Sequence, residues 1–112
     1  MQDLTPEEKL VMGRDELQTL KQIFERWMKS DISWAIDYIR SYGSTHEEDE
    51  WDFLREDWLE KFSQWIRPYL NRLEETQYIT RDDWVEYCDW AYVTIEIMMQ
   101  VLYKLGEETD GE

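Results

Sequence analysis

One apolar run near the C-terminal end constrains this chain more than any other feature of its sequence. It extends from Trp84 to Leu105 and consists mostly of Trp, Tyr, Val, Ile, Met and Leu. When the run is projected as a helix at about 100° per residue, its polar residues fall on one narrow stripe: Glu86, Asp89, Glu96, Gln100 and Lys104. A helix that is apolar over most of its circumference has neighbours on more than one side. We therefore expect the other segments to pack around this one.

Few residues in the chain favour turns. Its 112 residues include four Gly and two Pro, too few for a many-stranded sheet, whose turns recur about every 8–12 residues. Hydrophobic residues make up 42% of the chain, with seven Trp, seven Tyr and three Phe, enough apolar surface to offset the entropy lost on folding. We expect one all-α domain over residues 1–106, followed by an acidic, disordered tail over 107–112.

The N-terminal half carries the signals of one long helix. Thr5 and Glu8 form the pattern of a capping box around Pro6, so a helix should begin there. Gly43 supplies the conformation that ends it. One apolar face is predicted along its length: Leu17, Leu20, Phe24, Trp27, Trp34, Ala35, Tyr38 and Tyr42.

Two interruptions of this first helix remain open. Gly13 allows a short separate helix at the N-terminus. Ser30 is able to cap a new segment, and Asp31 follows it at a position where the heptad favours an apolar residue. A continuous helix and a helix broken near Ser30 are both compatible with the pattern.

A second long helix is predicted to start at Thr45, with Glu48 in the capping-box position. Trp51, Trp58 and Trp65 lie seven residues apart and share a face with Phe62, Ile66, Tyr69 and Leu73, which predicts a core-facing seam. Pro68 lacks the N–H that would bond the carbonyl of Gln64, so a kink or a restart is expected near it.

The third long helix is the apolar run itself, capped near Thr80 and ending at Gly106. Short connections place consecutive helices next to one another in opposite directions. The sequence therefore predicts an antiparallel bundle of three long helices.

The charge balance limits the partners of this chain. Twenty-seven Asp and Glu against twelve Lys and Arg give a net charge of −15, which disfavours direct binding to nucleic acid or to an anionic membrane. Halophilic adaptation and a basic protein partner both remain open. The single Cys88 predicts a buried thiol in a reducing compartment. No signal-peptide pattern or apolar run of membrane-spanning length is found, so we expect a cytoplasmic protein.

An acidic row is the first candidate for a binding site. Glu48, Asp52, Glu56 and Glu60 recur every four residues, which places their carboxylates about 6 Å apart along one helix face. Three further acidic residues flank the row: Asp49, Glu50 and Asp57. Such a row is able to imitate the phosphates of a nucleic acid in the groove of a basic protein. The alternative is an ordinary solvated helix face whose acidic residues suit the helix dipole.

An apolar flank on the third helix is the second candidate. It comprises Trp90, Val93, Ile97 and Val101, on the side opposite Tyr92 and Tyr103. Three helices hardly cover both sides, so a homodimer or a partner helix is expected to cover one of them. The alternative is that a kinked first helix covers both sides within the monomer.

Signals of catalysis are sparse. His46 is the single histidine and stands in an acidic turn, and no zinc, calcium or phosphate-loop spacing occurs. Two acidic pairs, Glu47 with Glu50 and Glu86 with Asp89, allow a remote alternative, a Mg²⁺-dependent nucleotide hydrolase. We expect no enzyme activity and no cofactor.

These features predict an acidic binding protein that inhibits or adapts a basic partner. Immunity proteins, antitoxins and nucleic-acid mimics share this physical profile, although no motif assigns the chain to any of them. The alternative is a structural subunit or homodimeric assembly factor that docks through the apolar flank.

Overall fold

The computed structural model describes residues 4–43 and 50–110, and this part of the chain is helical apart from its connections. The elements are α1 (Pro6–Tyr42), α2 (Asp52–Lys61), the π-helix η1 (Phe62–Ile66), α3 (Arg67–Glu75) and α4 (Arg81–Asp110). No strand occurs within the described ranges, so the all-α prediction is confirmed. Since α2, η1 and α3 follow one another without a gap, the predicted number of three long helical segments is confirmed as well.

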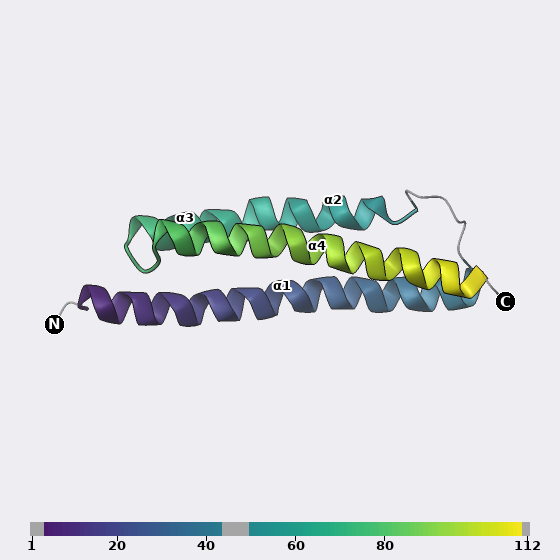
Figure 1. The fold of residues 1–112 in the computed structure, drawn as a ribbon, viewed down its shortest axis with the longest axis horizontal. Helices are drawn as coiled ribbons and strands as arrows, with labels where there is room; N and C mark the ends of the chain where they lie inside the picture. Colours follow the sequence, from purple (N-terminus) through teal and green to yellow (C-terminus); the bar gives the residue numbers. More distant parts are fainter. Residues whose placement is uncertain (1–3, 44–49, 111–112) are drawn as a thin grey trace.

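The helices form a thin rod. Figure 1 shows α1 and α4 side by side, with α2 and α3 placed end to end along α4. The rod measures 64 × 19 × 19 Å and has a radius of gyration of 17.9 Å, against about 13 Å for a compact domain of this length. Each helix therefore keeps a long outward surface. None of the described helices has an apolar stretch long enough to cross a membrane.

Both ends of α1 lie where the sequence predicts them. The Thr5 hydroxyl accepts a hydrogen bond from the Glu8 amide at 3.1 Å, and the Glu8 carboxylate accepts one from the Thr5 amide at 3.3 Å. Pro6 opens the helix, where its missing N–H leaves no carbonyl unpaired. At the other end Gly43 has a φ of 78° and donates its N–H to the Ile39 carbonyl at 2.7 Å. A positive φ of this kind favours glycine.

Between these ends α1 is continuous, so neither of the possible interruptions occurs. Gly13 lies inside the helix, and Ser30 is exposed in its middle. The polar residue in the heptad has a structural role: Asp31 Oδ2 accepts a hydrogen bond from Trp58 Nε1 at 2.7 Å, and Trp58 is fully buried. The carboxylate supplies the acceptor that a buried indole N–H requires.

Gly13 allows a close approach between α1 and the connection from α3 to α4. A Cβ atom at this position would lie 1.8 Å from the carbonyl oxygen of Tyr78 and 3.0 Å from Cγ2 of Ile79. Only a residue without a side chain fits against this carbonyl without displacing it. The glycine is thus explained by packing and not by the end of a helix.

The disturbance expected near Pro68 takes the form of the π-helix η1. Its hydrogen bonding runs from residue i to i+5, as in the bond from the Arg67 amide to the Phe62 carbonyl. The wider turn changes which residues face the core, and Trp65 is 69% exposed. The predicted core position of Trp65 is therefore wrong. The buried residues instead repeat every four positions: Leu54, Trp58, Phe62, Ile66 and Leu70.

The connection from α3 to α4 is a Schellman motif. The Gln77 amide donates to the Glu74 carbonyl at 3.0 Å, and the Tyr78 amide donates to the Leu73 carbonyl at 2.8 Å. Gln77 has a φ of 68°, a left-handed conformation that costs a residue with a Cβ atom roughly 1–2 kcal/mol. The motif satisfies the last carbonyls of α3 without a glycine.

The start of α4 follows the prediction, but its end does not. Thr80 and Asp83 form a second capping box, with side-chain to backbone distances of 3.0 and 3.1 Å. The helix then passes through Gly106 and ends at Asp110, so the predicted end at Gly106 is wrong. A glycine permits a helix to end but does not enforce it, since its cost inside a helix is only about 1 kcal/mol relative to alanine. Residues 107–110 of the predicted tail belong to α4, and 111–112 lie outside the described residues.

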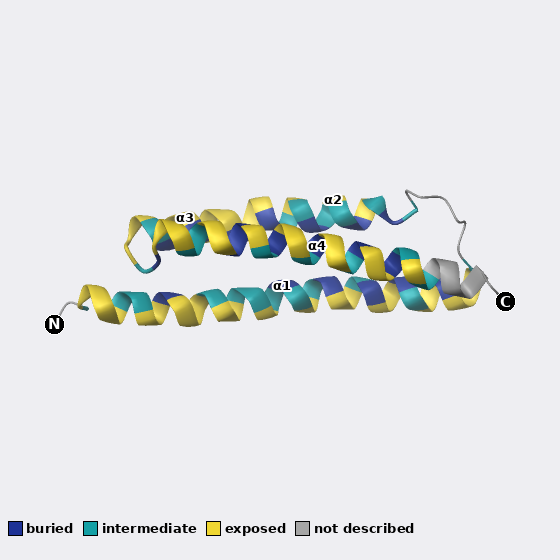
Figure 2. Ribbon diagram, in the orientation of Figure 1, coloured by how far each residue is buried: buried dark blue, intermediate teal, exposed yellow. Residues whose placement is uncertain are grey.

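The core follows the surfaces on which the helices meet, shown in dark blue in Figure 2. Its largest fully buried side chains are Phe24, Met28, Trp58, Phe62, Leu70, Tyr87, Ile95, Met99 and Leu102. In α1 the predicted apolar face is correct at the buried Phe24 and Ala35 and at the partly buried Leu17, Leu20 and Trp27, and it is wrong at three aromatic residues. Trp34, Tyr38 and Tyr42 are exposed, because the helix turns Met28, Ile32 and Ile39 toward the core in their place.

Candidate functional site

Among the described members of the acidic row, Glu56 and Glu60 are the most accessible carboxylates. Both are exposed on α2. Glu60 accepts a hydrogen bond from Gln64 Nε2 at 3.0 Å, and Glu56 forms no ion pair with a described residue. Consecutive members lie about 6 Å apart along the axis. This part of the row presents negative charge to the solvent.

Asp52 differs from them because it is engaged inside the molecule. Its carboxylate accepts hydrogen bonds from Arg55 Nη1 at 3.2 Å and from the hydroxyl of Tyr103 on α4. Arg55 also pairs with Glu96 on α4, with Nε 2.9 Å from Oε1. Burial and the hydrogen bond to Asp52 together raise the pKa of Tyr103 to about 12. Asp52 therefore joins α2 to α4 and contributes less charge to the surface.

The other acidic residues of this region are partly neutralised or not described. The carboxylate of Asp57 lies 3.0 Å from Lys61 Nζ, and the same ammonium lies 5.9 Å from the ring centre of Trp27. Glu48 and Asp49 lie outside the described residues. The described members of the row are thus two exposed carboxylates and one bridging aspartate, with the flanking Asp57 held in an ion pair.

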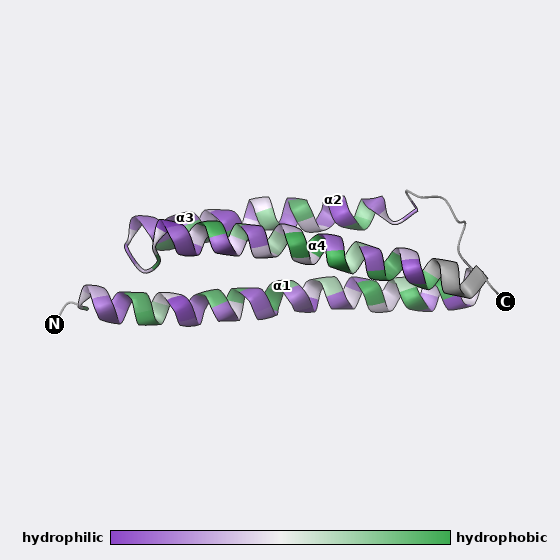
Figure 3. Cartoon of the chain, in the orientation of Figure 1, coloured by the Kyte–Doolittle hydropathy of each residue, from purple (hydrophilic) through white to green (hydrophobic). Residues whose placement is uncertain are grey.

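The structure divides the apolar flank into an inner and an outer part. Trp90 is half-buried against Tyr87 and Phe24, at ring-centre distances of 5.3 and 6.2 Å, with Lys21 Nζ 5.3 Å from its ring. The other three residues, Val93, Ile97 and Val101, are exposed, and we call them the aliphatic strip. Figure 3 shows hydrophobic residues in green along the middle turns of α4.

The polar stripe of α4 lies beside the aliphatic strip on the outer surface. All five of its members are exposed: Glu86, Asp89, Glu96, Gln100 and Lys104. The polar stripe found in the sequence is therefore a solvent-exposed face of α4.

A group of aromatic residues at one end of the bundle was not predicted as a surface, because Trp34, Tyr38 and Tyr42 were expected to face the core and are exposed. Trp34, Tyr38 and Tyr42 on α1 lie close to Trp51 and Phe53 around the start of α2. We call these five residues the aromatic cluster. The signal available was a conflict in phase: the run Met28, Ile32, Ile39 competes with the aromatic residues for the same core.

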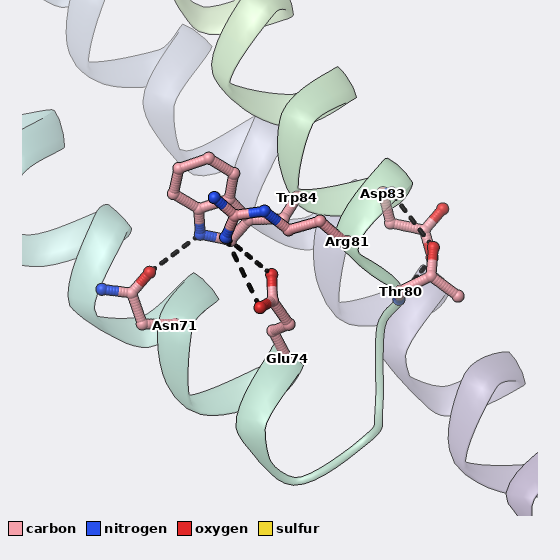
Figure 4. A network of polar contacts seen from close by, with 6 residues as sticks. All are labelled: Asn71, Glu74, Thr80, Arg81, Asp83 and Trp84. Carbon is pink, nitrogen blue, oxygen red and sulfur yellow. Dashed lines mark hydrogen bonds and ion pairs between the residues drawn. The ribbon is translucent and has the colours of Figure 1, made fainter.

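Figure 4 shows how the chain itself holds a cation against an aromatic ring. The guanidinium of Arg81 lies 4.1 Å from the ring centre of Trp84, and its Nη1 is 3.1 Å from Glu74 Oε2. Trp84 Nε1 donates to Asn71 Oδ1 at 2.8 Å. The arrangement combines stacking with an ion pair and fastens α3 to α4.

The described residues form no group that could hold a metal ion. No group of three or more His, Cys, Asp or Glu side chains within 4–43 and 50–105 is arranged to hold a metal ion. Glu47 and His46 lie outside the described residues. Burial raises the pKa of the Cys88 thiol, which lowers its reactivity as a nucleophile. Burial also raises the pKa of Tyr87.

Comparison with known proteins identifies no relative of this chain. No family model, no curated protein and no solved structure matches this chain. The function is therefore inferred from the surfaces described above.

Proposed function

We propose that the chain is a non-enzymatic binding module, an antiparallel three-helix bundle that binds a basic protein through the outward face of α2 and blocks or adapts it. The observation that carries the proposal is the pair Glu56 and Glu60, exposed on consecutive turns of a chain with net charge −15. Carboxylates at this spacing on a rigid helix match a surface that binds phosphates. Cys88, a buried free thiol, supports a reducing compartment such as the cytoplasm.

The bridging role of Asp52 changes which residues should be tested. Replacing it would break contacts with Arg55 and Tyr103, so a loss of binding would be hard to separate from a loss of folding. Glu56 and Glu60 form no such contacts between helices with any described residue. They are the residues on which the proposal depends.

The test isolates the partner first. The full chain is used as bait in an extract of its native host, and bound proteins are eluted in steps of increasing salt. The proposed partner is basic, elutes as the salt rises because screening weakens charge pairs, and is displaced by DNA or RNA added as a competitor.

Matched variants then locate the contact. Glu56→Gln with Glu60→Gln should weaken the purified complex by tenfold or more, about 1.4 kcal/mol. Glu86→Gln with Asp89→Asn removes the same number of charges from the exposed face of α4 and should weaken it far less. An equal loss in the two pairs would show that only net charge matters and would overturn the proposed contact.

A second candidate function rests on the aliphatic strip. Val93, Ile97 and Val101 expose aliphatic side chains on successive turns of α4, a surface suited to a homodimer or to a larger assembly. Association of this kind persists at high salt and is lost with Ile97→Asp. Sedimentation of the wild-type chain as a monomer at high concentration, with no partner retained at high salt, would exclude it.

A further inference from the structure

The aromatic cluster is the largest group of exposed rings in the described part of the chain. Tyr42 is 78% exposed, Trp34 53% and Phe53 51%, while Trp51 lies beneath them at 3%. Trp34 and Tyr38 meet the Trp51 ring edge-to-face, at ring-centre distances of 6.0 and 5.9 Å. Figure 1 places the end of α1 and the start of α2 at the same end of the rod. The cluster therefore forms one continuous surface from two helices.

Elsewhere in the molecule, cations of the chain itself lie over half-buried aromatic rings. Lys9 lies over Tyr78, Lys21 over Trp90, and Arg81 over Trp84. Among the described residues, no Lys or Arg lies over any ring of the aromatic cluster. The faces of Trp34, Tyr42 and Phe53 are thus open to a cation from outside.

Carboxylates continue the surface along α2. Phe53, Glu56 and Glu60 follow one another at i, i+3 and i+7 and therefore share one face of the helix. All three are exposed. A side chain that stacks on the exposed rings has a carboxylate within one helical turn.

The cluster also contains a donor without an acceptor. The Nε1 atom of Trp51 is buried and has no hydrogen-bond partner in the described structure. A buried donor left unpaired is costly, and an extended partner segment carries a carbonyl acceptor at every residue. The packing beneath the exposed rings thus leaves one hydrogen bond unmade.

We propose that the aromatic cluster, with Glu56 and Glu60, binds an arginine-bearing basic segment of a partner protein. The inference rests on the proposed function and adds that the surface recognises arginine in the partner. A planar guanidinium stacks on a ring while it pairs with a carboxylate, whereas an ammonium is a point charge. Arg81 does both on this chain, against Trp84 and Glu74. A second copy of the chain is disfavoured as the occupant because it carries the same net charge of −15.

The test uses an oligo-arginine peptide and an oligo-lysine peptide of equal length, titrated calorimetrically into the full chain. The expected result is a preference for arginine of roughly tenfold. Tyr42→Ala with Phe53→Ala should abolish most of that preference. Trp65→Ala removes an equally exposed ring outside the cluster and should leave the preference unchanged.

A second measurement needs no variant. In NMR spectra of the labelled wild-type chain, oligo-arginine should shift the indole signals of Trp34 and Trp51 and leave that of Trp65 in place.

The possible failures are distinguishable. If the two peptides bind equally and Glu56→Gln with Glu60→Gln removes the binding of both, the proposed preference for arginine is overturned. The proposed function is then still supported. Absence of salt-dependent binding of either peptide would overturn both. A homodimer that Tyr42→Ala dissociates would show that a second copy occupies the cluster and would overturn the inference.

Discussion

Trp58 donates its indole N–H to the carboxylate of Asp31 at 2.7 Å, across the interface between α2 and α1. Seven residues earlier, Trp51 is equally buried but its N–H has no acceptor in the described structure. The two tryptophans have similar burial and differ in whether the donor is paired. The contrast makes a direct comparison of the two side chains possible.

Trp58→Phe and Trp51→Phe should therefore have different effects on stability. Both remove the same atoms from the core, but only Trp58→Phe leaves the Asp31 carboxylate without its donor. We expect the free energy of unfolding to fall by roughly 1–3 kcal/mol more for Trp58→Phe than for Trp51→Phe. Urea denaturation followed by circular dichroism measures the difference. Equal losses would mean that the bond to Asp31 contributes nothing net.

Gly13→Ala should destabilise the chain. The added methyl group would meet the Tyr78 carbonyl at 1.8 Å, and relieving this overlap costs about 1–3 kcal/mol. Gly106→Ala, inside α4, is the control: it should raise the free energy of unfolding by up to about 1 kcal/mol, the helix propensity gained. Thermal unfolding of both variants checks the prediction. A gain in stability for Gly13→Ala would contradict the close approach.

Gln77→Gly should stabilise the chain by about 1 kcal/mol. Glycine adopts the positive φ of this position without the steric cost that a Cβ atom brings. Gln77→Ala keeps that cost and serves as the control, with little change expected. The quantity to compare is the urea midpoint of the two variants. If both shift alike, the left-handed conformation is not the cause.

Ionisation of Tyr103 should lower the free energy of unfolding in alkaline solution. Its pKa rises from 10.0 to about 12 through burial and the bond to Asp52, so the folded state binds this proton more tightly than the unfolded state does. The stabilisation is complete below pH 10 and is lost as the pH rises toward 12. Tyr103→Phe removes this titration, so the stability difference between wild type and variant should shrink over that interval. Urea titrations at successive pH values test this, and a constant difference would contradict the bond.

The helix starts could be predicted because their signals are local. At Thr5 and at Thr80, a hydroxyl and an acidic residue three positions later are enough to form a capping box. The all-α class follows from the scarcity of Gly and Pro. Gly43 ends α1 for a reason that is also visible in the sequence, its tolerance of a positive φ.

The errors arose where one segment depends on another. Trp65 keeps the heptad of Trp51 and Trp58, but the π-helix shifts the phase and exposes it. Asp31 interrupts a heptad for a reason that becomes visible only when Trp58 lies beside it. In the sequence Gly13 suggests an interruption of the helix, and the structure shows that it allows the Tyr78 carbonyl to approach closely.

Parts of the candidate site were equally dependent on tertiary contacts. The charge of the row and the exposure of Glu56 and Glu60 agree with the sequence pattern. The capture of Asp52 by Arg55 and Tyr103 could not be foreseen, because it needs the register of α4 against α2. The exposure of the aromatic cluster could not be predicted for the same reason, since it depends on which face of α1 packs against the other helices.

The contact at Gly13 also fixes the position of α1 along the long axis of the rod, relative to the connection between α3 and α4. If α1 slid by one turn, Lys9 or Leu17 would replace the glycine beneath the Tyr78 carbonyl, and neither side chain fits a space that excludes even a Cβ atom. A helix transmits such a constraint along its length at about 1.5 Å per residue. The absence of a side chain at Gly13, near one end of the rod, thus determines which residues of α1 meet Trp51 near the other end. These residues are Trp34 and Tyr38, roughly 30 Å from Gly13 along the helix.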